Sequence, residues 1–168
     1  MNTRPAREAD LPLILSIYNQ GIADRIATLE TEPKDLAYMT AWLKGRDPRH
    51  VVLVAERKGG TVVGWASINP YNPRLAYRAV GELSVYIDRE HRGKGIGQLL
   101  LDALEAEGRR HGFHKFVLFT FAFNALGQGL YRKKGYREVG TFREQGVLDG
   151  RRVDVMAMEK ILTDQSQP

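Results

Sequence analysis

A strand-like run that passes through a glycine-rich loop into an amphipathic helix is the feature that most constrains the fold of this chain. Residues 82–88 alternate between apolar and polar side chains, which places Leu83, Val85 and Ile87 on one face of a strand. The run Arg92-Gly93-Lys94-Gly95-Ile96-Gly97 follows, and apolar side chains then recur at helical spacing. The pattern predicts a strand, a tight loop and a helix in direct succession.

Strand and helix patterns alternate along the rest of the chain. Strands are expected near residues 2–5, 51–55, 62–68, 82–88 and 116–121, helices near 11–18, 36–43, 96–104 and 124–134, and a final hairpin over 136–162. The order β-α-α-β-β-β-α-β-α-β-β predicts an α/β fold with a mixed, mostly antiparallel sheet flanked by helices. No repeat or linker interrupts the pattern, so we expect a single domain over residues 1–162 and a flexible tail over residues 163–168.

Composition excludes several classes of protein. The chain has no cysteine, which excludes disulfides, a thiolate nucleophile and metal sites ligated by Cys. Its four histidines form no His-x-x-x-His pair, so no metal is expected. No stretch approaches the roughly 20 consecutive apolar residues of a membrane span, and no apolar run follows the charge at the amino terminus. We therefore expect a cytoplasmic protein without a membrane partner.

The chain carries more cations than anions. Lys and Arg number 25 against 20 Asp and Glu, a net charge of +5 that suits nucleic acid, an acidic surface or a polyanionic small molecule. The basic clusters Arg109-Arg110-His111 and Arg132-Lys133-Lys134 are short and far apart in the sequence. We interpret them as solvated helix ends and expect no nucleic-acid partner.

The loop at residues 92–97 has the form of an anion site, because backbone N–H groups and the helix dipole meet there. Its spacing fails the P-loop pattern, since no Ser or Thr follows a Gly-Lys pair. It also fails the dinucleotide pattern, since Gln98 stands where a small residue is needed. The alternative is a plain strand-to-helix turn. Three glycines interleaved with two cations favour pyrophosphate binding.

Several motifs together resemble the GNAT acetyltransferase superfamily over nearly the whole chain. These motifs are Arg92-x-x-Gly95-x-Gly97, Asn124 with Tyr131 seven residues later, and Lys134-Gly135-Tyr136. Within the superfamily, a second set is similar to the phosphinothricin and methionine sulfoximine acetyltransferase group. That set is Ile17-Tyr18-Asn19, Thr31-Glu32-Pro33, Tyr77 before Glu82, and Ser84-Val85-Tyr86-Ile87.

The resemblance implies a GNAT-like fold and an acetyl-CoA-dependent N-acetyltransferase. Acetyl-CoA would be a cosubstrate, its pyrophosphate held by Arg92, Gly93, Lys94, Gly95, Ile96 and Gly97. Its pantetheine arm would lie beside a splayed strand at Val85, Tyr86 and Ile87, bonded as an added strand would be. Backbone N–H groups there could receive the oxyanion of the tetrahedral intermediate. Asn124 would bond the pantetheine or diphosphate region, a role compatible with capping the following helix.

Amine acetylation needs a proton acceptor and a proton donor. The incoming ammonium must lose a proton before it attacks, and Glu82 is the candidate base, directly or through a water. The alternative is an ion pair between Glu82 and a cation such as Arg78. Tyr131 stands where the superfamily commonly places the tyrosine that protonates the leaving thiolate. The alternative there is a packing tyrosine on a short helix.

Substrate contacts are expected on the side opposite the cofactor. Tyr71, Arg74, Tyr77 and Arg78 collect in one segment, where an Arg fork suits a carboxylate and aromatic rings can wall a small ligand. Surface loop residues are the alternative. Thr28, Leu29 and Glu30 could close the pocket.

The final hairpin departs from the narrower group. Relatives tend to carry His near the turn and Trp after it, where this chain has Asp149 and then Arg152 or Val153. The departure leaves phosphinothricin itself open as the substrate.

Direct transfer to a small amino-acid-like amine is the leading hypothesis, because a chain without cysteine cannot form an acetyl-cysteine intermediate. The alternatives are acetylation of peptide or protein N-termini, a non-catalytic acetyl-CoA sensor and a nucleic-acid-binding module. Because members of the resembling group are commonly dimers, we expect a homodimer, with the final hairpin supplying a contact.

Overall fold

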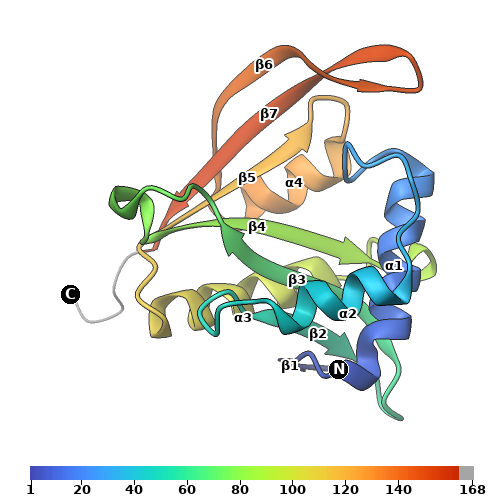
Figure 1. Cartoon of the computed structure of the whole chain (residues 1–168). Helices are drawn as coiled ribbons and strands as arrows, with labels where there is room; N and C mark the ends of the chain where they lie inside the picture. Colours follow the sequence, from blue (N-terminus) through green and yellow to red (C-terminus); the bar gives the residue numbers. More distant parts are fainter. Residues whose placement is uncertain (163–168) are drawn as a thin grey trace.

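Alternating and helical apolar patterns build a seven-stranded sheet with four α-helices in the computed structural model, which describes residues 1–162 (Figure 1). The strands are β1 (Asn2–Pro5), β2 (Val52–Glu56), β3 (Val62–Pro70), β4 (Val80–Ile87), β5 (Lys115–Phe121), β6 (Arg137–Leu148) and β7 (Arg151–Ile161). The helices are α1 (Leu11–Asp24), α2 (Leu36–Lys44), α3 (Ile96–Arg110) and α4 (Ala125–Lys133). The predicted order of elements is confirmed. The expected flexible tail, residues 163–168, lies outside the described residues.

The sheet is mixed, as predicted. Its strand order is β1-β2-β3-β4-β5-β7-β6, and every neighbouring pair is antiparallel except β4 and β5. Parallel strands need a long crossover, and α3 supplies it. The single parallel pair therefore lies at the centre of the sheet, directly after the strand–loop–helix unit of the sequence.

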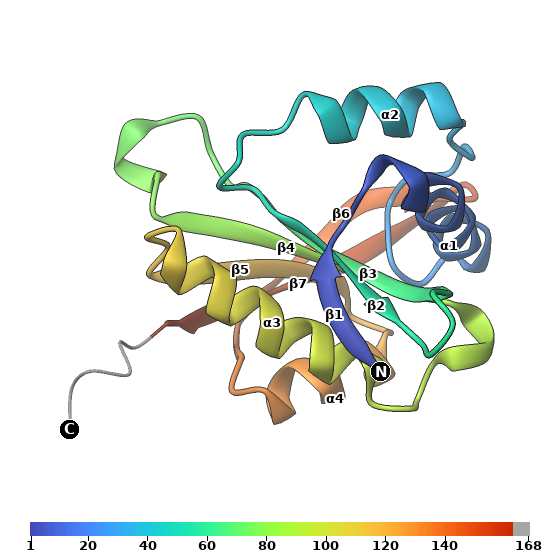
Figure 2. The same cartoon turned by 90° about the horizontal axis from the view of Figure 1, so that it is seen from below.

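Helices cover both faces of the sheet. Figure 2 shows α3 and α4 on one side and α1 and α2 on the other. Leu83, Val85 and Ile87 of β4 pack into the core cluster that contains Leu100 and Leu104 of α3. Tyr86 packs into the opposite cluster, beneath α1 and α2. The faces predicted from the alternation in β4 are confirmed, and both are covered by helices.

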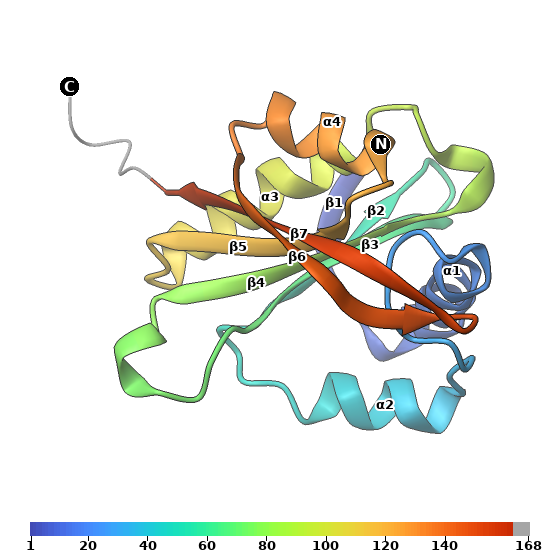
Figure 3. The same cartoon turned by 90° about the horizontal axis from the view of Figure 1, so that it is seen from above.

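The final hairpin folds back toward the segment that follows α1 (Figure 3). The Asp149 carboxylate in its turn accepts a hydrogen bond from Arg25 Nε at 3.1 Å. A methyl group added at Gly146 would lie 2.6 Å from Leu29 Cδ2, so the hairpin and residues 25–31 are in close contact. The predicted turn at Asp149-Gly150 is confirmed.

Residues 1–162 contain neither a membrane-spanning helix nor a cluster of metal ligands. No helix there combines the length and the apolar character that crossing a membrane requires. No group of three or more His, Cys, Asp or Glu side chains is placed to hold a metal ion in that range.

Candidate active site

A deep cavity opens where β4 and β5 diverge. The two strands pair only between residues 80–82 and residues 115–117, and beyond that point they separate (Figure 1). The resulting cavity has a volume of about 620 Å³. Its walls come from β4, β5, α4, the end of α1 and the glycine loop. The divergence of one strand pair therefore creates a cavity in which chemistry can take place.

One edge of β4 has no partner strand along this cavity. β3 pairs with β4 as far as Ile87, whereas the pairing with β5 stops at Glu82. Val85, Tyr86 and Ile87, which were predicted to bind pantetheine, all line the cavity. An extended chain with amide groups can pair with such an edge as an added strand.

Backbone geometry makes the glycine loop a cradle. Gly93 and Gly95 have φ angles of 73° and 82°, a left-handed conformation that side chains disfavour. Gly95 is the N-cap of α3 and no side chain caps that helix, so its first N–H groups remain available to an anion. A methyl group on Gly97 would lie 2.6 Å from a methyl of Leu130, so this glycine allows α3 and α4 to approach closely.

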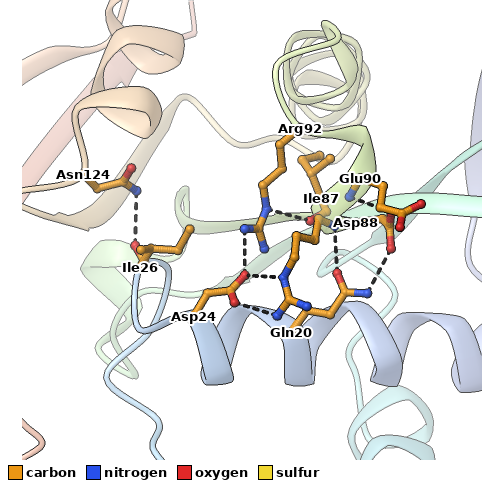
Figure 4. Close-up of polar contacts among 9 residues, drawn as sticks. Gln20, Asp24, Ile26, Ile87, Asp88, Glu90, Arg92 and Asn124 are labelled. Carbon is orange, nitrogen blue, oxygen red and sulfur yellow. Dashed lines mark hydrogen bonds and ion pairs between the residues drawn. The ribbon is translucent and has the colours of Figure 1, made fainter.

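Arg92 lines the cavity, but its guanidinium forms hydrogen bonds with other protein groups. Its guanidinium donates to Asp24 at 2.7 Å and to the Ile87 carbonyl at 3.3 Å (Figure 4). Arg89 also donates to Asp24, at 2.6 Å, and hydrogen bonds from Arg89 and Arg92 lower the pKa of the Asp24 carboxyl. Lys94 donates to the Glu90 carbonyl and does not line the cavity. The groups of this loop that remain free for an anion are therefore mainly backbone N–H groups.

Asn124 connects three parts of the site. Its Oδ1 accepts a hydrogen bond from Gly127 N at 3.0 Å and so caps α4. Its Nδ2 donates to the Ile26 carbonyl at 3.2 Å, which ties α4 to the segment after α1 (Figure 4). Asn124 also lines the cavity. The capping interpretation is confirmed, and cavity contact is compatible with it.

Glu82 stands at the point where the strands separate. Its side chain is half-buried in the cavity wall, and no residue within 1–162 forms a hydrogen bond or ion pair with its carboxylate. Burial raises the pKa of Glu82 above the usual value for a glutamate. The alternative of an ion pair with Arg78 finds no support in the structure. A carboxylate without a partner and with a raised pKa is suited to accepting a proton.

Tyr131 enters the cavity from α4, on the face of the sheet opposite Glu82. It packs against the α3 core cluster, and its ring meets that of Tyr136 edge to face, with centroids 6.0 Å apart. Burial raises the pKa of the Tyr131 phenol to about 12. The phenol therefore stays protonated at neutral pH, as a proton donor must.

The residues predicted to bind substrate fall into two groups. Thr28 and Leu29 line the cavity, whereas Glu30 is exposed and forms an ion pair with Lys34 at 2.9 Å. Another group lies on the exposed segment between β3 and β4, outside the cavity lining: Tyr71, Arg74, Tyr77 and Arg78. The Tyr71 and Tyr77 rings meet edge to face at 5.7 Å. The substrate role of this segment stays a prediction.

Several lining residues were not predicted. Phe119, Thr120 and Phe121 form the β5 wall, and Leu126 contributes from α4. The sequence showed residues 116–121 only as a buried strand. The exposure of its second half to a cavity follows from the divergence from β4, which no periodicity shows.

Known proteins share this architecture. The sequence profile of the acetyltransferase (GNAT) family matches residues 15–136. The chain belongs to the GNAT acetyltransferase family. An L-methionine sulfoximine/L-methionine sulfone acetyltransferase of Pseudomonas paraeruginosa is 37% identical over 157 residues, which cover 93% of this chain and 91% of that protein.

Solved structures of the GNAT family agree closely with this fold. A ribosomal-protein-alanine N-acetyltransferase from Brucella melitensis has a TM-score of 0.92 and 40% identity, covering 96% of this chain and 100% of its own. A phosphinothricin acetyltransferase from Sinorhizobium meliloti in complex with AcCoA has a TM-score of 0.91 and 30% identity, covering 96% and 88%. The predicted family and cosubstrate are confirmed: this GNAT protein is an acetyl-CoA-dependent N-acetyltransferase.

A methyl group at the N-cap of α3 should weaken cosubstrate binding. Gly95 has a left-handed backbone, which an alanine at the same position adopts only at a cost of about 1–2 kcal/mol. If the loop backbone relaxes to relieve this strain, its N–H groups turn away from the pyrophosphate. We expect the Kd for acetyl-CoA, measured by calorimetry, to rise about tenfold or more.

Gly112→Ala is the matched control for this variant. Gly112 has a φ of 79° and open space around its Cβ direction, but it lies at the far end of α3. The Gly112→Ala variant should have a lower Tm than wild type and an unchanged affinity for acetyl-CoA. Equal affinity in the two variants would contradict the role assigned to the loop.

Proposed function

We propose that this enzyme transfers the acetyl group of acetyl-CoA directly to the amine of a small amino-acid-like substrate of the phosphinothricin or methionine sulfoximine type. The observation that carries the proposal is the position of Glu82 and Tyr131 on opposite faces of the sheet at one cavity. The full-length relative named for methionine sulfoximine and methionine sulfone supports the substrate class.

Glu82 acts as the general base in this proposal. An α-amine has a pKa near 8 and is mostly an ammonium at neutral pH, so it must lose a proton before it attacks. The partner-free carboxylate accepts that proton directly or through one water. Its raised pKa brings it closer to the amine in proton affinity, which favours the transfer.

Tyr131 acts as the general acid. As the bond between the acetyl carbon and the sulfur breaks, the departing thiolate takes a proton from the Tyr131 phenol, which burial keeps protonated at neutral pH. Solvent then returns a proton to the phenolate. Backbone N–H groups on the unpaired edge of β4 stabilise the negative charge that develops on the acetyl carbonyl oxygen. With no cysteine in the chain, no acetyl-thioester on the protein is involved.

Substrate contacts come from two directions in the proposal. Thr28 and Leu29 close the cavity from the segment after α1. Arg74 and Arg78 lie on the exposed segment next to Glu82 in the chain and offer guanidinium groups to a substrate carboxylate.

Glu82→Gln tests the reaction and the base together. Release of CoA thiol from acetyl-CoA is measured with phosphinothricin, methionine sulfoximine, several L-amino acids and short peptides. We expect wild-type turnover with the small amino-acid-like amines and a loss of about 100-fold or more in Glu82→Gln. In wild type, the rate should fall on acidification at a pH above the usual range of a glutamate, because the carboxyl pKa is raised.

Stability separates this role from a structural one. Because the folded state binds the Glu82 proton more tightly than the unfolded state, stability falls as pH rises through its raised pKa. Glu82→Gln should therefore raise Tm at neutral pH while it lowers the rate. Glu138→Gln, an exposed carboxyl on β6, should change neither the rate nor the pH profile. Full activity of the Glu82→Gln variant would rule out Glu82 as the general base.

Tyr131→Phe tests the acid. We expect kcat to fall about tenfold to 100-fold, since the leaving thiolate loses its proton donor. In wild type the Tyr131 phenol should cause no alkaline loss of rate below its pKa of about 12. Tyr136→Phe removes a neighbouring buried hydroxyl that has no partner within residues 1–162, so it should leave kcat unchanged. Equal rates in the two variants would mean that water, and not Tyr131, gives the leaving thiolate its proton.

Acetylation of peptide or protein N-termini is the second candidate. It is favoured by the 40% identity with the Brucella melitensis enzyme named for ribosomal-protein alanine. In the same assay, turnover with alanine-starting peptides and none with free amino acids would favour this candidate.

We also propose a homodimer located in the cytoplasm. A chain without cysteine is suited to a reducing compartment. β6 is an edge strand that exposes the apolar side chains Val139, Phe142 and Val147, a surface that a second copy can cover. Light scattering at micromolar concentration should give twice the chain mass of 19.0 kDa. A monomer mass would contradict the dimer.

A further inference from the structure

Asp24 is the last residue of α1, and its carboxylate binds two arginines that take no part in the proposed proton transfers. Arg89 donates to it through two nitrogens, at 2.6 and 3.2 Å. Arg92, the first residue of the glycine loop, donates to it at 2.7 Å (Figure 4). We call these three side chains the Asp24 cluster.

The Asp24 cluster carries a net positive charge next to the cavity. Hydrogen bonds from Arg89 and Arg92 lower the pKa of the Asp24 carboxyl, so it is ionised at neutral pH. Neither arginine forms an ion pair with another carboxylate within residues 1–162. Two guanidinium groups therefore share one carboxylate. A diphosphate held by the N–H groups of the glycine loop would supply the second negative charge.

Arg92 can contact an anion and keep its bond to Asp24. Its guanidinium has five N–H donors, of which two form hydrogen bonds within residues 1–162, to Asp24 and to the Ile87 carbonyl. Arg92 is also part of the cavity wall. An anion on the free side of this guanidinium would orient it and weaken its repulsion of Arg89.

A second contact fixes the same end of α1 to the chain before the glycine loop. Gln20 lies one turn before Asp24 and accepts a hydrogen bond from the Arg89 backbone N–H at 2.8 Å. Its Nε2 donates to the Asp88 carboxylate at 2.9 Å (Figure 4). Gln20 and Asp24 share one face of the helix, four residues apart. The end of α1 and residues 88–92 are therefore held together.

Asp24 leads directly into residues 25–31, which form neither helix nor strand. Their position depends on attachments to other elements, such as the hydrogen bond from Asn124 to the Ile26 carbonyl. Thr28 and Leu29 of this segment line the cavity. Asp24 is the attachment that joins the segment to the glycine loop.

We propose that Asp24 is a positioning residue that transmits occupancy of the glycine loop to residues 25–31. A diphosphate in the loop balances the charge of the Asp24 cluster and so strengthens the contacts that hold the end of α1. A firmer end of α1 restricts residues 25–31 and prepares the cavity wall at Thr28 and Leu29. By linkage, an amine that binds this wall should bind more tightly when the loop is occupied. That last consequence rests on the proposed function, whereas the effect on residues 25–31 does not.

Hydrogen–deuterium exchange tests the proposal without an amine. CoA is the probe, because it can fill the loop without allowing turnover. We expect CoA to slow exchange in wild type both at residues 93–97 and, by about fivefold or more, at residues 25–31. In Asp24→Asn, residues 93–97 should keep this protection and residues 25–31 should lose most of theirs.

Three results of this experiment would overturn the proposal. Protection of residues 25–31 that persists in Asp24→Asn would mean that CoA restricts them without Asp24. Faster exchange there in wild type with CoA would mean that the diphosphate draws Arg92 away from Asp24. Unchanged exchange there in wild type would mean that the segment does not respond to the loop.

Two variants with the same chemical change serve as controls. Asp149→Asn removes the ion pair of Arg25 with the hairpin and leaves Asp24 in place. Residues 25–31 should then exchange faster with and without CoA, and the slowing by CoA should remain. Asp102→Asn, at an exposed ion pair on α3, should behave as wild type.

Arg89→Met keeps the proposal testable if Asp24→Asn does not fold. Arg89 is an exposed partner of Asp24 and is not part of the cavity wall, so its loss leaves the groups that face CoA in place. The slowing by CoA at residues 25–31 should be smaller than in wild type. A full wild-type response in Arg89→Met would contradict the proposal.

Calorimetry separates positioning from a purely structural role. Because Asp24→Asn removes a negative charge beside an anion site, its Kd for CoA should equal or fall below that of wild type. CoA should lower the Kd for methionine sulfoximine about fivefold or more in wild type and leave it unchanged in Asp24→Asn. Weaker CoA binding in the variant, with the wild-type effect on the amine retained, would mean a structural role only. If no amine binds but CoA still slows exchange at residues 25–31 through Asp24, the positioning role stands and the proposed function falls.

Discussion

The divergence of β4 from β5 is the constraint on which the rest of the site depends. A sheet normally pairs every internal edge, because unpaired backbone groups in the interior are costly. Here the pairing ends after residue 82 of β4, at the centre of the sheet. In the proposed function, a cosubstrate with amide groups would offset this cost by pairing with the exposed edge. One local departure from sheet pairing thus supplies the cavity, an unpaired edge of β4 and the position of Glu82.

Elements distant in sequence come together around this divergence. Arg92 ties the glycine loop to Asp24 at the end of α1, and Asn124 ties α4 to the Ile26 carbonyl. Arg25 joins the same segment to Asp149 in the final hairpin. The segment after α1, which contributes Thr28 and Leu29 to the cavity, is therefore anchored from three directions. The walls of the cavity are therefore held together by a shared set of polar contacts.

The sequence predicted much of the fold and part of the site. Period-two alternation in β4 showed its two faces, and the glycine spacing together with the family resemblance indicated the cosubstrate loop and Tyr131. Lys94 and Glu30 are predicted site residues that bond elsewhere, to the Glu90 carbonyl and to Lys34. The β5 wall at Phe119 and Phe121, and the Asp24 cluster, were not predicted, because each depends on contacts between elements far apart in the chain.

By itself the sequence determined the order of the elements, which faces are apolar and where the backbone needs glycine, since these follow from side-chain spacing and local sterics. Only the tertiary structure decided where β4 and β5 separate, that Glu82 has no ion-pair partner within residues 1–162, and that the buried indole N–H of Trp65 has no acceptor there. Those properties arise from packing and desolvation among residues far apart in the chain, which a linear pattern does not contain.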